Sequence, residues 1–369
     1  MKVPSATTVF ATLALLATSA ACAAQASRIV FERSLSNSDG TLRSSTLYRV
    51  NADGTGLVRL RPMTTGVYLG AATWSPHGTA IAYQRSAGAA LHSDIWIMTA
   101  AGNNPRRITS GAADHLHPAW GPDGGRVAFI ARGASGACLG LVRPDGTGQH
   151  ELFCPPGPAS IDRTPQWTPD GNALLVSTSF AGTGIDAPLH VRAWRVDAAT
   201  GSTVLLAARE EDASHPRSFV FSADGRRALF ASDWSEQPIE YVDFAAGTSM
   251  LLGQGRAAVF SHDGSRFAFT RRGFTGAPDF LSFDHVWVAD VDGGAMHEVT
   301  PALVEDIEYV AAGWSGNDTR LLVDRTVYAP IAPGSGLYVG TPAMRIFNVA
   351  TGAQANLPGG AAEDWYQSP

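Results

Sequence analysis

The stretch Trp74-Ser-Pro-His-Gly78, followed by the apolar run Ala80-Ile-Ala-Tyr83, decides the fold of this chain. A tight turn with glycine between apolar runs is a strong hairpin signal, because glycine accepts the positive φ that such a turn requires. The same unit returns five more times, at Trp120-Gly-Pro-Asp-Gly124, Trp167-Thr-Pro-Asp-Gly171, Phe221-Ser-Ala-Asp-Gly225, Phe260-Ser-His-Asp-Gly264 and Trp314-Ser-Gly-Asn-Asp318. Six copies indicate a repeat architecture.

A second motif, a strand that turns at a glycine into another strand, occurs seven times, with its turns at Gly54, Gly102, Gly146, Gly201, Gly247, Gly293 and Gly352. The missing seventh copy of the first motif is explained by the two ends of the repeat region. Arg28-Ile-Val-Phe31 is a second strand without its aromatic partner, and Ala362-Glu-Asp-Trp365 is an aromatic segment without a following strand. We therefore expect the C-terminal segment to join the N-terminal blade and close a ring, which removes exposed sheet edges.

The predicted fold class is all-β, a seven-bladed β-propeller over residues 27–369. Seven units in these 343 residues average about 49 residues each, as expected for four-stranded blades. Six or eight blades are the alternatives, because the repeat between Gly201 and Gly247 is irregular. The length of 369 residues alone would suggest two or three domains, whereas the repeats predict one.

The composition excludes several classes of protein. Hydrophobic residues make up 45% and charged residues 16%, so the chain is too apolar to be disordered. The formal charge is −6 and the 27 basic residues are scattered, whereas a nucleic-acid-binding protein needs a basic patch or stripe. The 39 glycines and 22 prolines have no collagen period and fit a fold with many turns.

Residues 1–26 have the pattern of a secretory signal peptide, with Lys2 at the start, an apolar Ala- and Leu-rich stretch, and Ala-x-Ala motifs ending at Ala23 and Ala26. The apolar stretch is shorter than the roughly 20 residues of a spanning helix. We therefore expect an exported protein, periplasmic or secreted, that does not span a membrane. Cys22 stands where a bacterial lipoprotein carries its lipid, so a lipid anchor is the alternative to ordinary cleavage.

Cys138 and Cys154 are the two cysteines outside this segment, and an even pair in an exported chain predicts a disulfide. Strand-like stretches flank the turn Pro144-Asp-Gly-Thr-Gly148 between them. A hairpin at this turn would place the two thiols opposite each other. Two free buried thiols are the alternative.

The repeats closely resemble the TolB-type propeller repeat. The resemblance is carried by Trp74-Ser-Pro-His-Gly78, Asp94-Ile-Trp-Ile-Met98, Arg106-Arg-Ile-Thr109 and His117-Pro-Ala-Trp120, and it extends more weakly over nearly all of residues 27–369. It implies a propeller fold and a tendency to bind proteins, and it implies no reaction. TolB proteins also carry an α/β domain ahead of the propeller, so we expect a TolB-like propeller alone and do not carry over the cellular role of TolB.

Residues a few positions before each aromatic should border the central channel, where propellers usually bind ligands. This set is rich in histidine, arginine and aromatic groups, which suit polar or anionic partners. It comprises Tyr68, Asp114, His115, His117, Asp162, Arg163, His215, Arg217, Arg256, Glu308 and Tyr309. We expect the aspartates of the turns to be turn formers, and the repeated Trp and Phe residues to be core anchors.

Asp114-His115-Leu-His117 is the sharpest candidate within this set. On a regular strand, His115 and His117 would point to one side, and His215 from another blade could complete a divalent-metal site. A family of propeller lyases acting on oligogalacturonides uses channel histidines in this way, but its full ligand set is not matched here. Three interpretations are open: solvated histidines without a metal, which we favour, a metal site, and ligand binding without a metal.

No nucleophile elbow, Walker A motif or Cys-x-x-Cys pair occurs in the sequence. We therefore favour a non-enzymatic, monomeric scaffold without a cofactor, which binds a protein or cell-envelope component at its channel face. The alternative is a metal-assisted, lyase-like carbohydrate-active enzyme. In that enzyme the histidines would hold the metal, and Arg163 or Arg217 would neutralise a substrate carboxylate.

Overall fold

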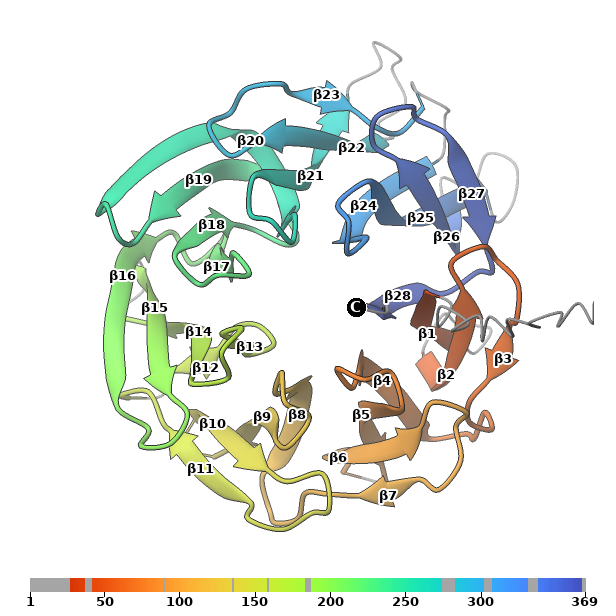
Figure 1. The fold of residues 1–369 in the computed structure, drawn as a ribbon, viewed down its shortest axis with the longest axis vertical. Helices are drawn as coiled ribbons and strands as arrows, with labels where there is room; N and C mark the ends of the chain where they lie inside the picture. The colour runs from red at the N-terminus through yellow and green to blue at the C-terminus, as the bar shows by residue number, and fades with distance from the viewer. Residues whose placement is uncertain are drawn as a thin grey trace, which may run out of the picture.

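The computed structural model describes residues 27–36, 42–88, 90–134, 136–157, 159–182, 187–273, 283–301, 307–330 and 338–366. The predicted signal peptide and Cys22 lie outside these residues. Sheets follow one another in a ring around a central axis, with the chain advancing from one sheet to the next (Figure 1). All the regular secondary structure in the described residues is β-strand, which confirms the predicted all-β class.

Each sheet is an antiparallel succession of short strands from the channel outward. Four sheets have four strands: β28 (Ala361–Tyr366), β1 (Arg28–Ser36), β2 (Leu42–Asn51) and β3 (Val58–Arg59); β4 (Val67–Trp74), β5 (Ala80–Ala87), β6 (His92–Thr99) and β7 (Arg106–Arg107); β8 (Asp114–Trp120), β9 (Val127–Gly133), β10 (Gly136–Val142) and β11 (His150–Phe153); and β24 (Ile307–Trp314), β25 (Arg320–Pro330), β26 (Tyr338–Asn348) and β27 (Gln354–Leu357). A fifth sheet has its inner strand in two pieces and comprises β12 (Ser160–Ile161), β13 (Gln166–Trp167), β14 (Ala173–Ala181), β15 (Leu189–Asp197) and β16 (Thr203–Glu211).

The remaining sheet has seven strands, because the long strand β20 serves two units. Its members are β17 (Ser218–Phe221), β18 (Arg227–Ala231), β19 (Gln237–Asp243), β20 (Thr248–Phe260), β21 (Arg266–Gly273), β22 (Phe283–Asp290) and β23 (His297–Glu298). The part of β20 up to Gly255 pairs with β19, and the part from Arg256 pairs with β21. Dividing this sheet at β20 gives the seven blades of the prediction, and counting hydrogen-bonded sheets gives six.

The ring closes as the sequence predicts. β28 pairs antiparallel with β1, with Ile29 opposite Trp365 and Val30 opposite Asp364. In Figure 1, β28 lies at the inner edge of the N-terminal sheet, between β24 and β4. The indole Nε1 of Trp365 donates to Ser27 Oγ at 2.5 Å, so the two ends of the repeat region are held by side-chain as well as backbone contacts.

The aromatic turns have the expected structural role. In the turn at Thr168, the amide of Gly171 donates to the carbonyl of Thr168 at 2.9 Å, and Gly171 has a φ of +68°. Asp170 accepts hydrogen bonds from the Thr168 hydroxyl and from the amide of Asn172, which lower its pKa to about 2. The aromatics are core residues that pack between neighbouring sheets, as Trp167 does against Leu139 and Leu141.

Cys138 and Cys154 form the predicted disulfide. The hairpin of β10 and β11 brings them together, since Leu139 lies opposite Phe153. In the part of the chain that the structure describes, no helix has the length and apolar character needed to cross a bilayer.

Candidate functional site

The channel has two different ends. The inner strands start at one end, here called the entry side, and run into the aromatic turns at the other, here called the turn side. The residues predicted to border the channel cluster towards the entry side. A large cavity lies instead on the turn side, and His117 is the one predicted residue that lines it.

On the entry side, the predicted arginines are engaged in ion pairs with neighbouring blades. Arg163 Nη2 lies 2.5 Å from Asp233 Oδ1, and this pair joins the β12–β16 sheet to the next one. Arg217 donates to both carboxylate oxygens of Glu211 at 2.6 and 2.8 Å, and this pair joins the same two sheets. The Arg217 and Glu211 side chains are 15% and 9% exposed, so this pair is shielded from solvent, whereas Asp233 in the other pair is 38% exposed.

Arg256 forms the third such link. Its guanidinium contacts Asp284 and lies 2.5 Å from Glu308 Oε1, while the hydroxyl of Tyr328 donates to the other oxygen of Glu308 at 2.7 Å. The Arg256 side chain is 12% exposed. Because the three predicted arginines already have internal carboxylate partners, they hold blades together and offer little free positive charge to an anionic ligand.

Two other predicted residues also serve as links between sheets. The Tyr68 hydroxyl donates to the carbonyl of Leu42 at 3.1 Å. Asp114 accepts from the amide of Ser93 at 2.9 Å and lies 3.1 Å from His92 Nδ1. These contacts join the N-terminal sheet to the β4–β7 sheet, and that sheet to the β8–β11 sheet.

Asp162 and His215 have local partners. Asp162 accepts hydrogen bonds from the hydroxyls of Ser177 and Ser179, and burial raises its pKa. His215 is exposed and its Nδ1 lies 2.8 Å from Ser214 Oγ. Neither residue lines the large cavity.

The expectation that His115 and His117 share one side of a strand is wrong, because a β-bulge separates them. The register shifts between Leu116 and Ala119, and His117 has a φ of +51°. His115 is 2% exposed and points into the protein, with Nδ1 3.1 Å from Asp94 Oδ1 and Nε2 3.3 Å from the amide nitrogen of Gln149. Both ring nitrogens thus have partners inside the protein, so His115 is a core histidine.

The same bulge recurs three residues before the aromatic in other inner strands. Ala71 in β4 and Ala257 in β20 have φ values of +48° and +49° and lie at the same kind of register shift. The bulge turns His117 into the channel. Burial, with a smaller contribution from Arg132, lowers the pKa of His117, so the imidazole is neutral at pH 7.

Tyr309 is also placed differently from the prediction. It is 3% exposed and packs edge-on against Phe347, with ring centroids 6.1 Å apart. The alternation of a strand explains this result, since Glu308 faces the channel side while its neighbour faces the core. Tyr309 is therefore a core residue and not a channel residue.

The three histidines do not form a metal site in this structure. Within the described ranges, the only group of three or more His, Cys, Asp or Glu residues whose ligand atoms lie within 4.8 Å of one another is Cys138, Glu151 and Cys154. Two members of that group are joined in the disulfide. The residues present therefore do not fit a histidine-bound metal of the kind considered from the sequence.

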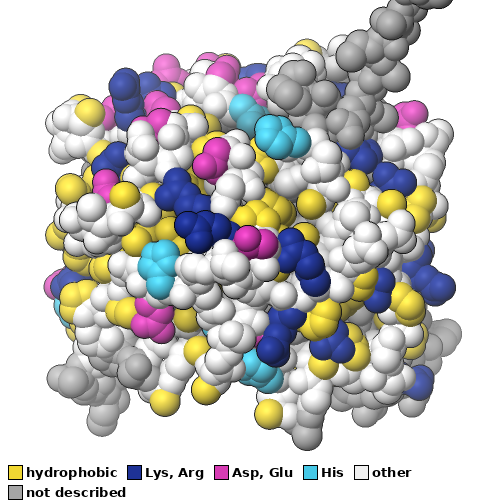
Figure 2. All heavy atoms as spheres, turned by 60° about the horizontal axis from the view of Figure 1, so that its bottom comes forward, with side chains coloured by type: hydrophobic (Ala, Val, Ile, Leu, Met, Phe, Trp, Pro, Cys, Tyr) yellow, Lys and Arg dark blue, Asp and Glu magenta, His cyan; other side chains and the backbone are white. Residues whose placement is uncertain are grey.

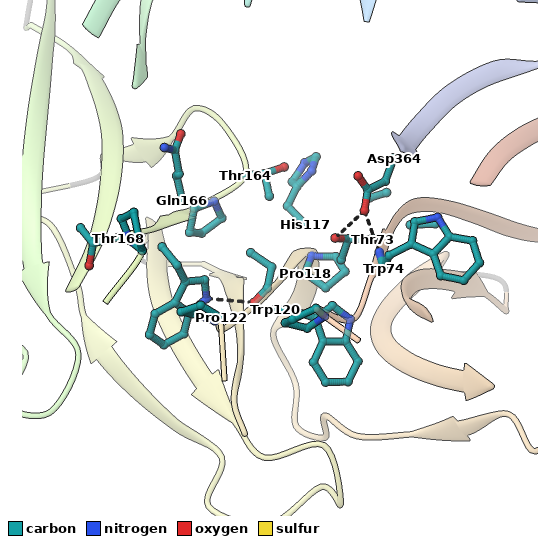
Figure 3. Close-up of a pocket in the computed structure, with 17 residues that line it drawn as sticks. Thr73, Trp74, His117, Pro118, Trp120, Pro122, Thr164, Gln166, Thr168 and Asp364 are labelled. Atoms are coloured by element: carbon teal, nitrogen blue, oxygen red, sulfur yellow. Dashed lines mark hydrogen bonds between the residues drawn. The ribbon is translucent and has the colours of Figure 1, made fainter. Parts of the chain in front are cut away.

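The channel cavity on the turn side has a volume of about 750 Å³ and is lined by three consecutive blades together with β28. Its wall carries the indoles of Trp74, Trp120 and Trp167 and several prolines. Figure 3 shows Thr164, His117 and Asp364 around the open centre, while Trp74 and Trp120 lie farther from the channel axis. The cavity is thus mainly apolar, with a few polar groups that converge on its centre.

Asp364 is the acidic group of this cavity. Its carboxylate accepts from the amide of Trp74 at 2.7 Å and from the hydroxyl of Thr73 at 3.1 Å, and burial raises its pKa. On the other side, Asp364 also lines a smaller cavity of about 230 Å³ that contains His262 and Trp365. The closing strand therefore places a carboxylate at the wall between two cavities.

Sequence reasoning missed this cavity because it placed the ligand site at the entry side. The signal was present in the repeated turns, where Pro76, Pro122 and Pro169 follow the aromatics in three successive blades. These prolines and aromatics line the cavity together. The face shown in Figure 2 has basic and acidic side chains interspersed, in agreement with the scattered charges of the sequence.

The chain is similar to several solved structures of known proteins. No protein-family model matches the chain, and no curated protein matches it. Among solved structures, TolB from Acinetobacter baumannii is 16% identical, with a TM-score of 0.50 over 93% of this chain and 83% of that chain. An oligogalacturonate lyase in complex with manganese is 12% identical, with a TM-score of 0.59 over 91% and 86% of the two chains. An oligogalacturonate lyase from Vibrio parahaemolyticus is 11% identical, with a TM-score of 0.59 over 91% and 87%.

The chain is thus an all-β propeller. More particularly, its fold is TolB-like, as the sequence motifs indicate, and the likeness to the lyases is of the same kind. At these identities the similarity concerns the fold, and function has to be argued from the site.

Proposed function

We propose that this protein is an exported, non-enzymatic scaffold that binds an extended segment of a protein partner in the channel cavity. The observation that carries the proposal is the composition of that cavity, which combines three tryptophans and several prolines with the polar groups of His117, Gln166 and Asp364. Export is supported by the secretory pattern of residues 1–26 and by the disulfide of Cys138 and Cys154.

The chemistry of the cavity suits a polypeptide. Trp74 and Trp167 are 5% and 9% exposed, so they give the cavity a rigid apolar wall, and the exposed Pro122 and Pro169 supply apolar surface that a ligand can reach. Grooves lined by aromatic side chains bind extended or polyproline-type segments, and a few polar groups then fix direction and register. His117 is neutral at pH 7 and can act as either donor or acceptor towards a peptide group.

The lyase-like alternative depends on a ligand set that these residues do not assemble. It requires His115 to reach a metal, yet His115 is buried against Asp94. It also requires Arg163 or Arg217 to meet a substrate carboxylate, and both arginines already pair with Asp233 and Glu211. These contacts favour the scaffold over the enzyme.

The test is a pair of variants on opposite ends of the channel. Thr164 is exposed and lines the cavity, and Thr164→Arg would place a long, charged side chain in it. Trp234 is 84% exposed next to Asp233 on the entry side, so Trp234→Ala is the matched control. The assay is capture of partners from cell-envelope extract, followed by titration of the purified partner against each variant.

We expect Thr164→Arg to weaken binding of that partner at least tenfold and Trp234→Ala to leave it unchanged. The opposite pattern would place the binding surface on the entry side and refute the proposal. Turnover of oligogalacturonate by the wild-type protein, lost in His117→Ala, would support the enzymatic alternative instead.

A further inference from the structure

One position of the repeat carries an arginine in five of its seven copies. It is the residue that begins, or directly precedes, the second strand of each unit. The arginines are Arg28, Arg126, Arg227, Arg266 and Arg320, and the two exceptions are Ala80 and Ala173.

The arginines at this position reach across to the aromatic turn of the next blade. Arg126 stacks over the ring of Trp167 at 4.8 Å and donates to the carbonyls of Gly171 at 2.9 Å and Ala198 at 3.3 Å. Its guanidinium thus satisfies two backbone acceptors and covers an indole face.

Three other copies repeat the donation to the turn carbonyl. The acceptors are Gly78 for Arg28 at 2.9 Å, Gly264 for Arg227 at 3.2 Å, and Asp318 for Arg266 at 2.6 Å. The fifth arginine, Arg320, lies over the ring of Trp365 at 5.7 Å. The protein therefore contains its own examples of how the turn side of a blade boundary holds a guanidinium group.

The boundary that follows Ala173 lacks this arginine and contains a groove of about 620 Å³. Gly225 and Phe244 line the groove and are the counterparts of Gly171 and Ala198. A shared backbone hydrogen bond establishes the equivalence, since Phe244 N donates to Arg226 O as Ala198 N donates to Asn172 O, at 3.0 and 2.9 Å. The groove thus lies where the repeat places a guanidinium.

The carboxylates of Asp170 and Asp224 also line this groove, together with Arg195 and Arg226. Asp170 is ionised at neutral pH, because its hydrogen bonds with Thr168 and Asn172 lower its pKa to about 2. The groove therefore offers an ionised carboxylate beside the backbone acceptors, which favours a charged donor over a neutral one.

At the other exception, Ala80, the counterpart of Gly225 is Gly124. The side chain of His77 approaches Gly124 there, at 3.8 Å from the position of an added Cβ. At Gly225 the nearest side chains are Leu175 and Thr168, which belong to the buried wall below the groove. The groove lies at the boundary between the β12–β16 sheet and the next blade, which starts at β17. Figure 1 shows these two sheets as neighbours in the ring.

We propose that this groove binds the guanidinium group of an arginine side chain presented by a partner protein. The site lies outside the channel cavity and goes beyond the function proposed above. Arginine fits better than lysine, because a planar fork can donate to the carbonyls of Gly225 and Phe244 together, as Arg126 does to their counterparts.

The test uses a blocked Gly-Arg-Gly peptide as the probe, with a Gly-citrulline-Gly peptide as the uncharged analogue of the same shape. Binding to the full chain is measured by chemical-shift changes of the backbone amides of Gly225 and Phe244. Ala173→Arg supplies the missing guanidinium from within the chain, and Ala80→Arg is the matched control at the other boundary that lacks the arginine.

We expect the arginine peptide to shift these two amides and to bind at least tenfold more tightly than the citrulline peptide. Ala173→Arg should weaken peptide binding at least tenfold, and Ala80→Arg should leave it unchanged. Ala245→Trp, at an exposed position in the groove, is a second blocking variant should Ala173→Arg not fold. Equal binding of the two peptides, or unchanged binding to a folded blocking variant, would overturn the proposal.

Discussion

Replacing Asp324 with asparagine should change how the stability of the ring depends on pH. Asp324 lies on β25 and accepts a hydrogen bond at 3.0 Å from the amide of Ala362, where the closing strand β28 begins. Burial raises the pKa of this carboxyl from 3.8 to about 7, against a smaller opposing effect of that hydrogen bond. The group therefore links protonation to the contact that closes the propeller.

The sign of the effect follows from the two states. Between pH 3.8 and pH 7 the folded protein keeps the proton on Asp324, whereas the unfolded chain has released it. The free energy of unfolding therefore falls as the pH rises through this range, by about 1.4 kcal/mol per pH unit for this one group. Above pH 7 both states are ionised at this position and the contribution is constant.

The asparagine side chain of the variant would keep an oxygen acceptor for the Ala362 amide and could not ionise. We expect Asp324→Asn to gain stability relative to wild type by about 3 kcal/mol between pH 5 and pH 7, and the difference to level off above pH 7. The assay is urea unfolding of both proteins at half-unit steps from pH 5 to pH 8.5. Because other buried groups such as Asp162 titrate in both proteins, only the difference between the two curves is interpreted. A constant difference across this range would refute the reasoning.

Three further outcomes follow from the contacts described above. Arg126→Ala should lower the free energy of unfolding by about 2–3 kcal/mol, because the variant loses two charged hydrogen bonds and the stack on Trp167. Methylguanidinium at millimolar concentration should raise the urea midpoint of this variant more than it raises the urea midpoint of wild type. The Cys138→Ser, Cys154→Ser double variant should lose about 3 kcal/mol by the same measurement, because the disulfide closes a loop with a sequence separation of 16. Deletion of residues 361–369 should abolish cooperative unfolding and promote aggregation, measured by light scattering, because it removes β28 and exposes the inner edge of β1.

The fold could be predicted from the sequence because its signals are local and repeated. The aromatic turn at Trp167 and the glycine turn at Gly201 each indicate one hairpin, and six or seven copies of these motifs indicate a ring of blades. The mismatch between the two counts predicted the pairing of β28 with β1, which the structure confirms. The shared strand β20 could not be predicted, because the change of partner at Gly255 leaves no turn signal.

The candidate site was harder to predict because it depends on which way single side chains point. Regular alternation predicts one side for His115 and His117, and the bulge at His117 reverses this. Asp233, the partner of Arg163, is 70 residues away in the sequence, so this ion pair could not be predicted from a local pattern. Glu211 is only six residues from Arg217, but the sequence does not show that the turn between β16 and β17 brings the two side chains together. The prolines that follow the aromatics in three blades mark part of the cavity lining in the sequence, but the cavity itself also needs β28, which only the closed ring brings beside them.

Site-specific photo-crosslinking tests the central claim most directly. A photoreactive amino acid is placed at Thr164 in the channel cavity or at Trp234 on the entry side, and the full chain is irradiated in the cells that produce it. If the partner binds in the cavity, we expect a defined protein adduct from position 164 and none from position 234. An adduct from position 234 alone would contradict the account.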